Sequence, residues 1–182
     1  MIYLKKYYQN YEILMVRYGR LDLIQRIKVK HLCNQAAKYG QLKILIWAHE
    51  NGYEWDVNTC YYAAQGNIDC LKYLYEQGCP WSVNTCYYAA QHLECLTFLH
   101  EHGCPWDKGT CQSAARGHLA CLKYAHENGC PWDKYTCENA ARGDLLCLKY
   151  AHEHGCPWDK DDCITVAQIY DSSQCMTYID EN

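Results

Sequence analysis

Two helical patterns of apolar and polar positions alternate along the chain. Between residues 57 and 66, Cys60, Ala63 and Ala64 fall at i, i+3 and i+4, so they share one face of a helix. After a turn at Gly66, residues 67–78 carry a broader apolar stripe beside a charged strip. The stripe consists of Ile68, Cys70, Leu71, Leu74 and Tyr75. The pattern predicts a helical hairpin made of a short first helix and a longer second helix.

This hairpin pattern recurs with a nearly constant period. Five tryptophans, Trp55, Trp81, Trp106, Trp132 and Trp158, stand 26, 25, 26 and 26 residues apart. A fixed period of this length is typical of repeat proteins, in which each unit buries its apolar stripe against its neighbours. The sequence therefore predicts an all-α solenoid of about seven stacked helix-turn-helix hairpins.

The repeat divides the chain into three segments. Residues 1–29 form a degenerate N-terminal cap, residues 30–158 hold five repeats, and residues 159–182 form a C-terminal cap that lacks the Gly-Cys-Pro-Trp ending. At 182 residues the whole chain, residues 1–182, is expected to be a single repeat domain.

Residues at the ends of the predicted helices have recognisable roles. An aspartate, Asp107 or Asp133, precedes the first helix and is a suitable N-cap because its side chain accepts a free amide hydrogen bond. Gly78 predicts the end of the second helix, and Pro80 prevents its continuation.

The motif A-A-x-x-G-x-L ending in L-x-x-x-G resembles the ankyrin repeat. It reads AAKYGQLKILIWAHENG at residues 36–52 and AARGHLACLKYAHENG at residues 114–129, and related segments cover nearly the whole chain. The unit is shorter than the 33 residues of an ankyrin repeat, and the missing residues fall where ankyrin repeats carry a β-hairpin finger. The unit is most similar to short ankyrin-like repeats rich in Gly-Cys-Pro-Trp-Asp, found in giant viruses of amoebae and in some protists. The resemblance implies a finger-less ankyrin-like solenoid, a protein partner and no catalytic chemistry.

Fifteen cysteines raise the question of metal binding or disulfides. The spacings within a unit, as in Cys111, Cys121 and Cys130, include no C-x-x-C pair, which argues against a zinc site. We predict buried structural thiols, since free cysteine behaves as a small apolar residue. A bond within one repeat, such as Cys111 to Cys121, is the alternative.

Histidine and tryptophan also recur. His100, His126 and His152 stand in the last turn of the second helix, where a positive or polar side chain is favoured by the helix dipole. Metal binding is the alternative for these histidines. Each of the five periodic tryptophans follows the turn between hairpins, where we expect its ring to pack against the next repeat; a ladder for gripping a ligand is the alternative.

No serine-nucleophile motif, phosphate loop or metal motif is present, so no enzymatic activity, cofactor or metal is expected. The positions that differ between repeats are the outward ones of the first helices, including Gln35 and Lys38. Tyrosine and arginine, common in interface hot spots, recur among them, although tyrosine is frequent throughout this chain. The candidate partner-binding residues are Tyr61, Tyr62, Gln65, Tyr87, Tyr88, Gln91, Ser113, Arg116, Asn139 and Arg142.

Charge is unevenly distributed. Residues 1–30 hold seven Lys/Arg and two Asp/Glu, whereas residues 159–182 hold one and six. The asymmetry reflects either solvated ends, head-to-tail association, or an acidic partner for the N-terminal end. The expected function is a non-enzymatic scaffold that binds a protein partner through the inner helix face. The alternative is a structural or assembly protein, such as a viral one, that associates through its charged ends. We expect an intracellular monomer, in the cytoplasm of a host cell or in a virion, that binds neither nucleic acid nor membranes.

Overall fold

The computed structural model describes residues 11–182. The described residues belong to two compact units, which are divided between Trp81 and Ser82. The described residues contain helices and turns and no strand. The all-α prediction is therefore confirmed for these residues, and no β-hairpin finger is present among them. Each unit is described separately.

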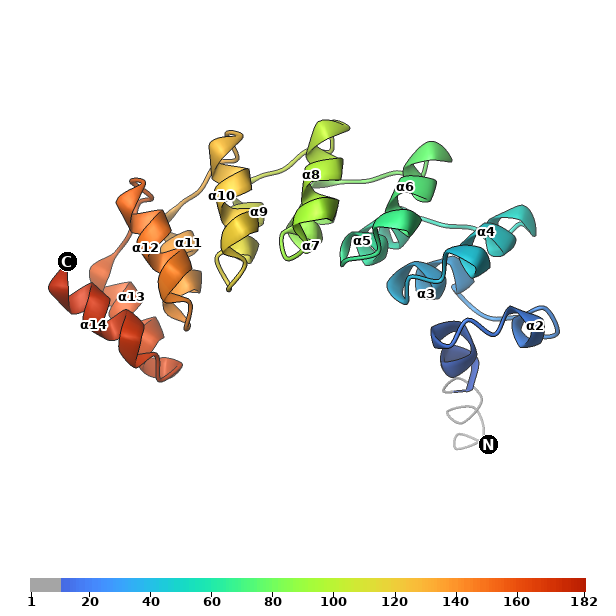
Figure 1. The fold of residues 1–182 in the computed structure, drawn as a ribbon, viewed down its shortest axis with the longest axis horizontal. Helices are drawn as coiled ribbons and strands as arrows, with labels where there is room; N and C mark the ends of the chain where they lie inside the picture. The colour runs from blue at the N-terminus through green and yellow to red at the C-terminus, as the bar shows by residue number, and fades with distance from the viewer. Residues whose placement is uncertain (1–10) are drawn as a thin grey trace. The chain divides into compact units, whose positions relative to one another are not determined.

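The first unit consists of helical hairpins. Residues 11–17 are helical and precede a single helical turn, α2 (Leu21–Ile24). The further helices are α3 (Leu32–Lys38), α4 (Leu42–Glu50), α5 (Val57–Ala64) and α6 (Ile68–Glu76). Helix α3 packs on α4 and α5, and α6 packs on α5 and α4. The first helices of the hairpins thus lie in one layer and the second helices in another (Figure 1).

The second unit repeats this arrangement. Its helices are α7 (Val83–Ala89), α8 (Leu93–Glu101), α9 (Lys108–Ala114), α10 (Leu119–Glu127), α11 (Lys134–Ala141), α12 (Leu145–Glu153), α13 (Lys160–Ile169) and α14 (Ser173–Glu181). The first helices α7, α9, α11 and α13 pack on one another in order, and so do the second helices α8, α10, α12 and α14 (Figure 1). Within each unit the hairpins thus follow one another as predicted, and neighbouring hairpins pack on each other.

The ends of the helices follow the residues that predict them. Gly78 has φ +73° and lies just after α6, and the N–H of Cys79 donates to the carbonyl of Leu74 at 2.9 Å. Asp107 accepts the N–H of Gly109 at 2.9 Å and so caps α9. Asp133 occupies the same position before α11, but its side chain makes no capping bond. The N-cap prediction is therefore correct for Asp107 and wrong for the side chain of Asp133, which bonds to the preceding hairpin instead.

All fifteen cysteines are buried free thiols, as predicted for structural residues. The cysteine of each Gly-Cys-Pro segment reaches back to the start of its own hairpin: the thiol of Cys130 donates to the carbonyl of Asp107 at 3.2 Å, and that of Cys156 to the carbonyl of Asp133 at 3.3 Å. The cysteine thus ties the end of a hairpin to its beginning. No bond joins Cys111 and Cys121.

The periodic tryptophans pack between hairpins. The ring of Trp132 stacks on His126 with centroids 3.8 Å apart and meets Tyr150 of the next hairpin edge-on at 6.4 Å. Equivalent stacks join Trp55 to His49 and Trp106 to His100, and the ring of Trp158 lies tilted against that of His152 at 4.0 Å. Trp81 follows a second helix that carries Tyr75 in place of histidine, and its ring stacks on Tyr75 at 5.0 Å. The structure thus supports the packing interpretation of these tryptophans.

Candidate functional site

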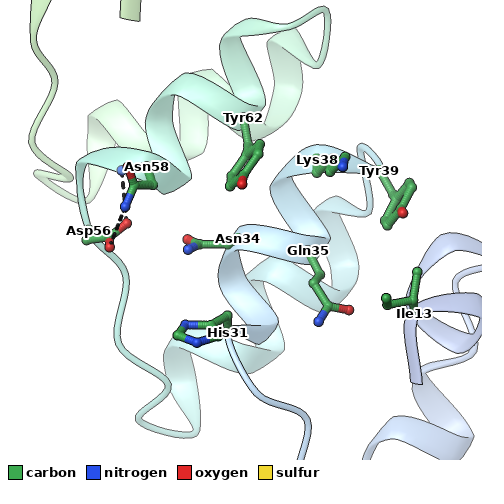
Figure 2. Close-up of a pocket in the computed structure, with 9 residues that line it drawn as sticks. All are labelled: Ile13, His31, Asn34, Gln35, Lys38, Tyr39, Asp56, Asn58 and Tyr62. Atoms are coloured by element: carbon green, nitrogen blue, oxygen red, sulfur yellow. Dashed lines mark hydrogen bonds between the residues drawn. The ribbon is translucent and has the colours of Figure 1, made fainter. Parts of the chain in front are cut away.

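A groove lies over the exposed side of α3 in the first unit. We define the α3 groove by its lining residues, which are Ile13, His31, Asn34, Gln35, Lys38, Tyr39, Asp56, Asn58 and Tyr62. Its volume is about 380 Å³ (Figure 2). His31, Asn34, Gln35 and Lys38 follow one another at i, i+3, i+4 and i+7, so they line one face of the helix.

The groove exists because α3 carries short side chains where its neighbour carries large ones. Asn34 and Gln35 occupy the positions that Tyr61 and Tyr62 occupy in α5. The surface along α3 is therefore recessed relative to that of α5, and the ring of Tyr62 on α5 forms one wall of the groove (Figure 2). Helix α3 also begins only one residue before Cys33, whereas α5 begins three residues before Cys60. His31, which precedes α3, has a left-handed backbone with φ 50° that few residues other than glycine adopt.

The side-chain amides of Asn34 and Gln35, at the base of the α3 groove, each have one polar atom in a hydrogen bond and one polar atom without a hydrogen bond within residues 11–182. The side-chain oxygen of Asn34 accepts the hydroxyl of Thr59, so its nitrogen is left as a donor. The nitrogen of Gln35 donates to the carbonyl of Lys30 at 3.0 Å. The Oε1 of Gln35 is buried and has no hydrogen-bond partner among the described residues. A buried acceptor without a partner is costly unless a ligand satisfies it.

The upper part of the groove combines a cation with aromatic rings. The Nζ of Lys38 lies 5.8 Å from the ring centre of Tyr62 and 5.9 Å from that of Tyr39, within the range of cation–π contacts. The ring of Tyr61 lies 4.4 Å from that of Tyr62 and supports it from the side. Gln65 follows α5 and is exposed.

At the opposite end of the groove, the carboxylate of Asp56 already accepts hydrogen bonds from within the protein. Its carboxylate accepts the N–H of Asn58 at 2.9 Å, the side-chain nitrogen of Asn58 at 2.9 Å and the N–H of Thr59 at 3.3 Å. The negative charge of Asp56 is therefore held by the start of α5, and Lys38 is the cation among the residues that line the groove.

In the second unit, the predicted tyrosines lie on the exposed side of α7. The rings of Tyr87 and Tyr88 meet edge-on at 5.3 Å, and Tyr88 is 38% exposed. Gln91, just after this helix, is also exposed. Tyr88 and Gln91 are therefore accessible, and Tyr87 is half-buried.

The prediction that Ser113 and Asn139 point outward is wrong, because their side chains are buried, with 1% and 8% exposure. They occupy the positions of Tyr62 and Tyr88, but their short side chains do not extend beyond the neighbouring groups. The Nε of Arg116 donates to the side-chain oxygen of Asn139 at 3.0 Å. The side-chain nitrogen of Asn139 donates to the carbonyl of Tyr135 at 2.9 Å.

The two predicted arginines are exposed but take part in contacts between hairpins. Arg116 of the α9 hairpin bonds to Asn139 on α11. The guanidinium of Arg142 lies over the ring of Tyr170, 5.1 Å from its centre. Their immediate role is therefore to join consecutive hairpins.

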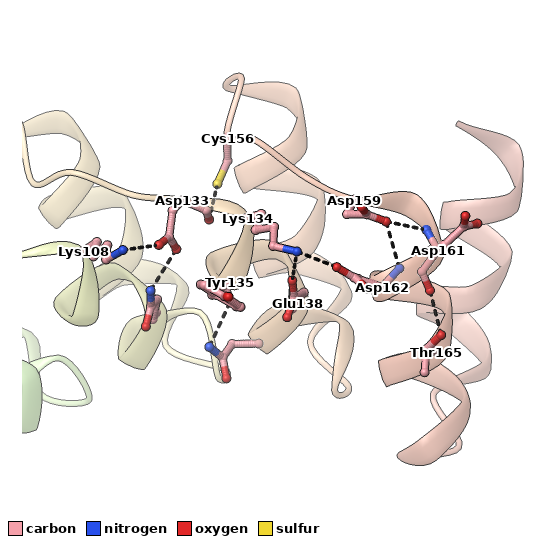
Figure 3. Close-up of polar contacts among 12 residues, drawn as sticks. Lys108, Asp133, Lys134, Tyr135, Glu138, Cys156, Asp159, Asp161, Asp162 and Thr165 are labelled. Carbon is pink, nitrogen blue, oxygen red and sulfur yellow. Dashed lines mark hydrogen bonds and ion pairs between the residues drawn. The ribbon is translucent and has the colours of Figure 1, made fainter.

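A polar network crosses the exposed side of α9, α11 and α13 (Figure 3). Asp133 binds Lys108 at 3.0 Å and the side-chain nitrogen of Gln112 at 2.8 Å. Lys134 binds Asp162 at 2.7 Å. The Oε1 of Glu138 lies 3.7 Å from Lys134, too far for a hydrogen bond, and burial raises the pKa of this carboxyl group. The network connects consecutive hairpins of the second unit.

The described residues provide no cluster for metal chemistry. Within residues 11–182, no three His, Cys, Asp or Glu side chains are grouped to hold a metal ion. Burial raises the pKa of the Cys121 thiol to about 11, so this thiol stays protonated near neutral pH and is a poor ligand or nucleophile. None of the helices in this range has the length and apolar character to cross a lipid bilayer.

Comparison with known proteins identifies the fold. No protein-family model matches the sequence, and no curated protein matches it either. Among solved structures, the chain is similar to the crystal structure of the human ASB11 ankyrin repeat domain, with a TM-score of 0.62 and 18% identity over 79% of this chain and 83% of that domain. The fold is that of an ankyrin repeat domain. At this level of identity the similarity concerns the fold alone.

Within this ankyrin-type fold, the structure brings together only part of the predicted site. Tyr62 lines the α3 groove with Gln35 and Lys38, which the sequence already places outward on α3. His31 and Asn34 are not among the predicted site residues. The signal that could have identified them is the contrast between Asn34-Gln35 and Tyr61-Tyr62 at equivalent positions, which predicts a depression in the row of first helices.

Proposed function

We propose that the chain is a non-enzymatic protein-binding module that holds a partner on the exposed side of its first helices. The observation that carries the proposal is the α3 groove, where Asn34, Gln35 and Lys38 present hydrogen-bonding groups without a hydrogen-bond partner beside the ring of Tyr62. Tyrosine and arginine side chains of the kind that dominate interface hot spots are exposed in both units. The ankyrin repeat fold, widely used for protein recognition, supports the same conclusion.

The experiment substitutes two of the candidate tyrosines. Purified chain carrying Tyr62→Ala and Tyr88→Ala should fail to capture the partner that the wild-type chain retains from cell extract. The matched control is Tyr18→Ala, which removes a tyrosine that is 70% exposed and lies outside the α3 groove. Helical circular dichroism must be equal in all three proteins. Capture by the double variant at the wild-type level would refute the assignment of the site.

A second function is favoured by the charge distribution. Residues 1–30 carry a net charge of +5 (seven minus two) and residues 159–182 carry −5 (one minus six). Oppositely charged ends support a structural or assembly protein that associates head to tail. Sedimentation velocity at low and high salt tests this, because association through exposed charges weakens as salt screens them. A monomer at low salt would exclude it.

The repeat type extends the proposal to a biological setting. Gly-Cys-Pro-Trp-Asp repeats resemble those of giant viruses, which supports a viral protein that binds a host protein in the cytoplasm. Fractionation of infected cells, with detection of the chain in cytosol and virions, would test this assignment.

A further inference from the structure

We infer that the α3 groove binds an acidic, extended segment of a partner protein, with a partner carboxylate seated between Lys38 and Tyr62. This inference rests on the proposed function and specifies the chemistry of the partner. It concerns the first unit only.

Three groups in the α3 groove can donate hydrogen bonds to one carboxylate. In the described part of the chain, the Nζ of Lys38 has only its two aromatic contacts, and it makes no ion pair. The hydroxyl of Tyr62 and the side-chain nitrogen of Asn34 also have no acceptor there. Figure 2 shows Tyr62 and Asn34 directed into the groove from α5 and α3. Donors that line one groove favour an anionic group, and bonds to charged groups are the stronger ones.

The surrounding charge favours the same ligand. Among the described residues 11–30, five are Lys/Arg and two are Asp/Glu. Parts of this basic segment lie against the α3–α4 hairpin, since Gln35 donates to the carbonyl of Lys30 and Gln41 donates to that of Arg17, each at 3.0 Å. Asp56, the acidic residue that lines the groove, is already bonded to the start of α5. An acidic segment would therefore be attracted at long range and paired at short range.

The Oε1 of Gln35 distinguishes a peptide from a simple anion. This buried oxygen has no partner in the described structure and can only accept a hydrogen bond. A phosphate or a free carboxylate would present an oxygen to it, which is unfavourable. An extended peptide presents a main-chain N–H a few ångströms from each of its side chains. One acidic residue can thus satisfy Lys38 through its carboxylate while a neighbouring N–H satisfies Gln35.

The experiment is a selection on the folded full-length chain. A random-peptide library displayed on phage is selected on the wild-type chain, and the enriched peptides are synthesised with a fluorescent label and titrated by anisotropy. Enriched peptides should contain Asp or Glu, and their binding should weaken as salt rises. Lys38→Gln should lower affinity by roughly tenfold or more, as expected for the loss of a hydrogen bond to a charged group.

Matched variants define the controls. Lys43→Gln makes the same chemical change at an exposed position of α4 outside the groove and should bind like the wild type. Lys38→Arg keeps the charge and should retain most of the affinity. Circular dichroism spectra that match the wild type show that a loss of binding is not a loss of folding.

Several results would overturn the inference. These are enriched peptides without acidic residues, no enriched peptide at all, equal binding by the Lys38→Gln and Lys43→Gln variants, or binding of a labelled oligothymidylate in place of peptides. The inference and the proposed function can fail separately. If Lys38→Gln still captures the cellular partner while the Tyr62 and Tyr88 double variant does not, the inference fails and the proposed function stands, because the partner then uses other chemistry. If the double variant captures the partner at the wild-type level, the proposed function fails.

Discussion

The Nδ1 of His126 lies 3.0 Å from the hydroxyl oxygen of Tyr150 in the next hairpin, and the His126 ring stacks on Trp132 at 3.8 Å. The same hydrogen bond joins His100 to Tyr124 and His152 to Tyr178. A polar bond thus accompanies the aromatic packing between hairpins. Because stacked repeats are stabilised mainly by contacts with their neighbours, these bonds should contribute to the cooperativity of unfolding.

Removal of this bond should be measurable. Tyr150→Phe keeps the ring but deletes the hydroxyl, and it should lower the free energy of unfolding by about 1 kcal/mol. Trp132→Ala removes a half-buried ring and should cost about 2–3 kcal/mol. Urea unfolding followed by circular dichroism checks both values. A larger loss for Tyr150→Phe than for Trp132→Ala would show that the hydrogen bond outweighs the aromatic packing.

The His126 contact also predicts a dependence of stability on pH. Burial, together with the nearby His154, lowers the pKa of His126 below its ordinary value. The unfolded chain then binds the proton more readily than the folded chain. The contribution of His126 is therefore fully present above a pH of about 6.5, and it is lost as the pH falls through the lower pKa of the folded state.

The difference between wild type and His126→Gln isolates this effect, since all other groups titrate in both proteins. The free energy of unfolding of the wild type minus that of the variant should decrease as the pH falls below about 6.5. Urea titrations at several pH values provide the curve. A difference that is constant with pH, or that grows on acidification, would contradict the prediction.

Two equivalent aspartates should respond differently to substitution. Asp107 caps α9 through the N–H of Gly109, whereas the carboxylate of Asp133 binds Lys108 and Gln112 (Figure 3). Asp107→Ala should cost about 1 kcal/mol, the usual loss of an N-cap, and this cost should change little with salt. The cost of Asp133→Ala should decrease as salt screens the ion pair. Thermal unfolding of both variants at low and high salt checks the contrast, and the same salt response in both would refute it.

The fold could be predicted from the sequence because each repeat makes the same local demands. Gly78 ends a helix through its positive φ, Cys130 fills a small buried site, and Trp132 fills the junction between hairpins. These roles depend on near neighbours, so the period of about 26 residues and the residue types are enough to indicate them.

The candidate site was harder to predict because it depends on relative side-chain length and on contacts between repeats. Ser113 and Tyr88 occupy equivalent positions, yet only the longer side chain reaches the solvent. The bond from Arg116 to Asn139 spans 23 residues of sequence, and no local pattern predicts it. Asp133 carries the sequence signal of an N-cap, but Lys108 and Gln112 compete for its carboxylate.

Thiol reactivity should follow the packing of the hairpins. Burial raises the pKa of Cys121 to about 11 and that of Cys70 to about 12, so both thiols should be protected from an aromatic disulfide reagent at mildly alkaline pH.

Cys175 lies on α14, which packs on α12 and α13, whereas α12 packs on α10, α11 and α14. Helices with fewer neighbours open locally at lower free energy. Cys175 should therefore be the first of the described thiols to react. The release of the chromophore should show one fast phase that Cys175→Ala removes and Cys121→Ala leaves intact, with the remaining thiols reacting only when urea unfolds the chain. Persistence of the fast phase in the Cys175→Ala variant would show that another hairpin opens more readily.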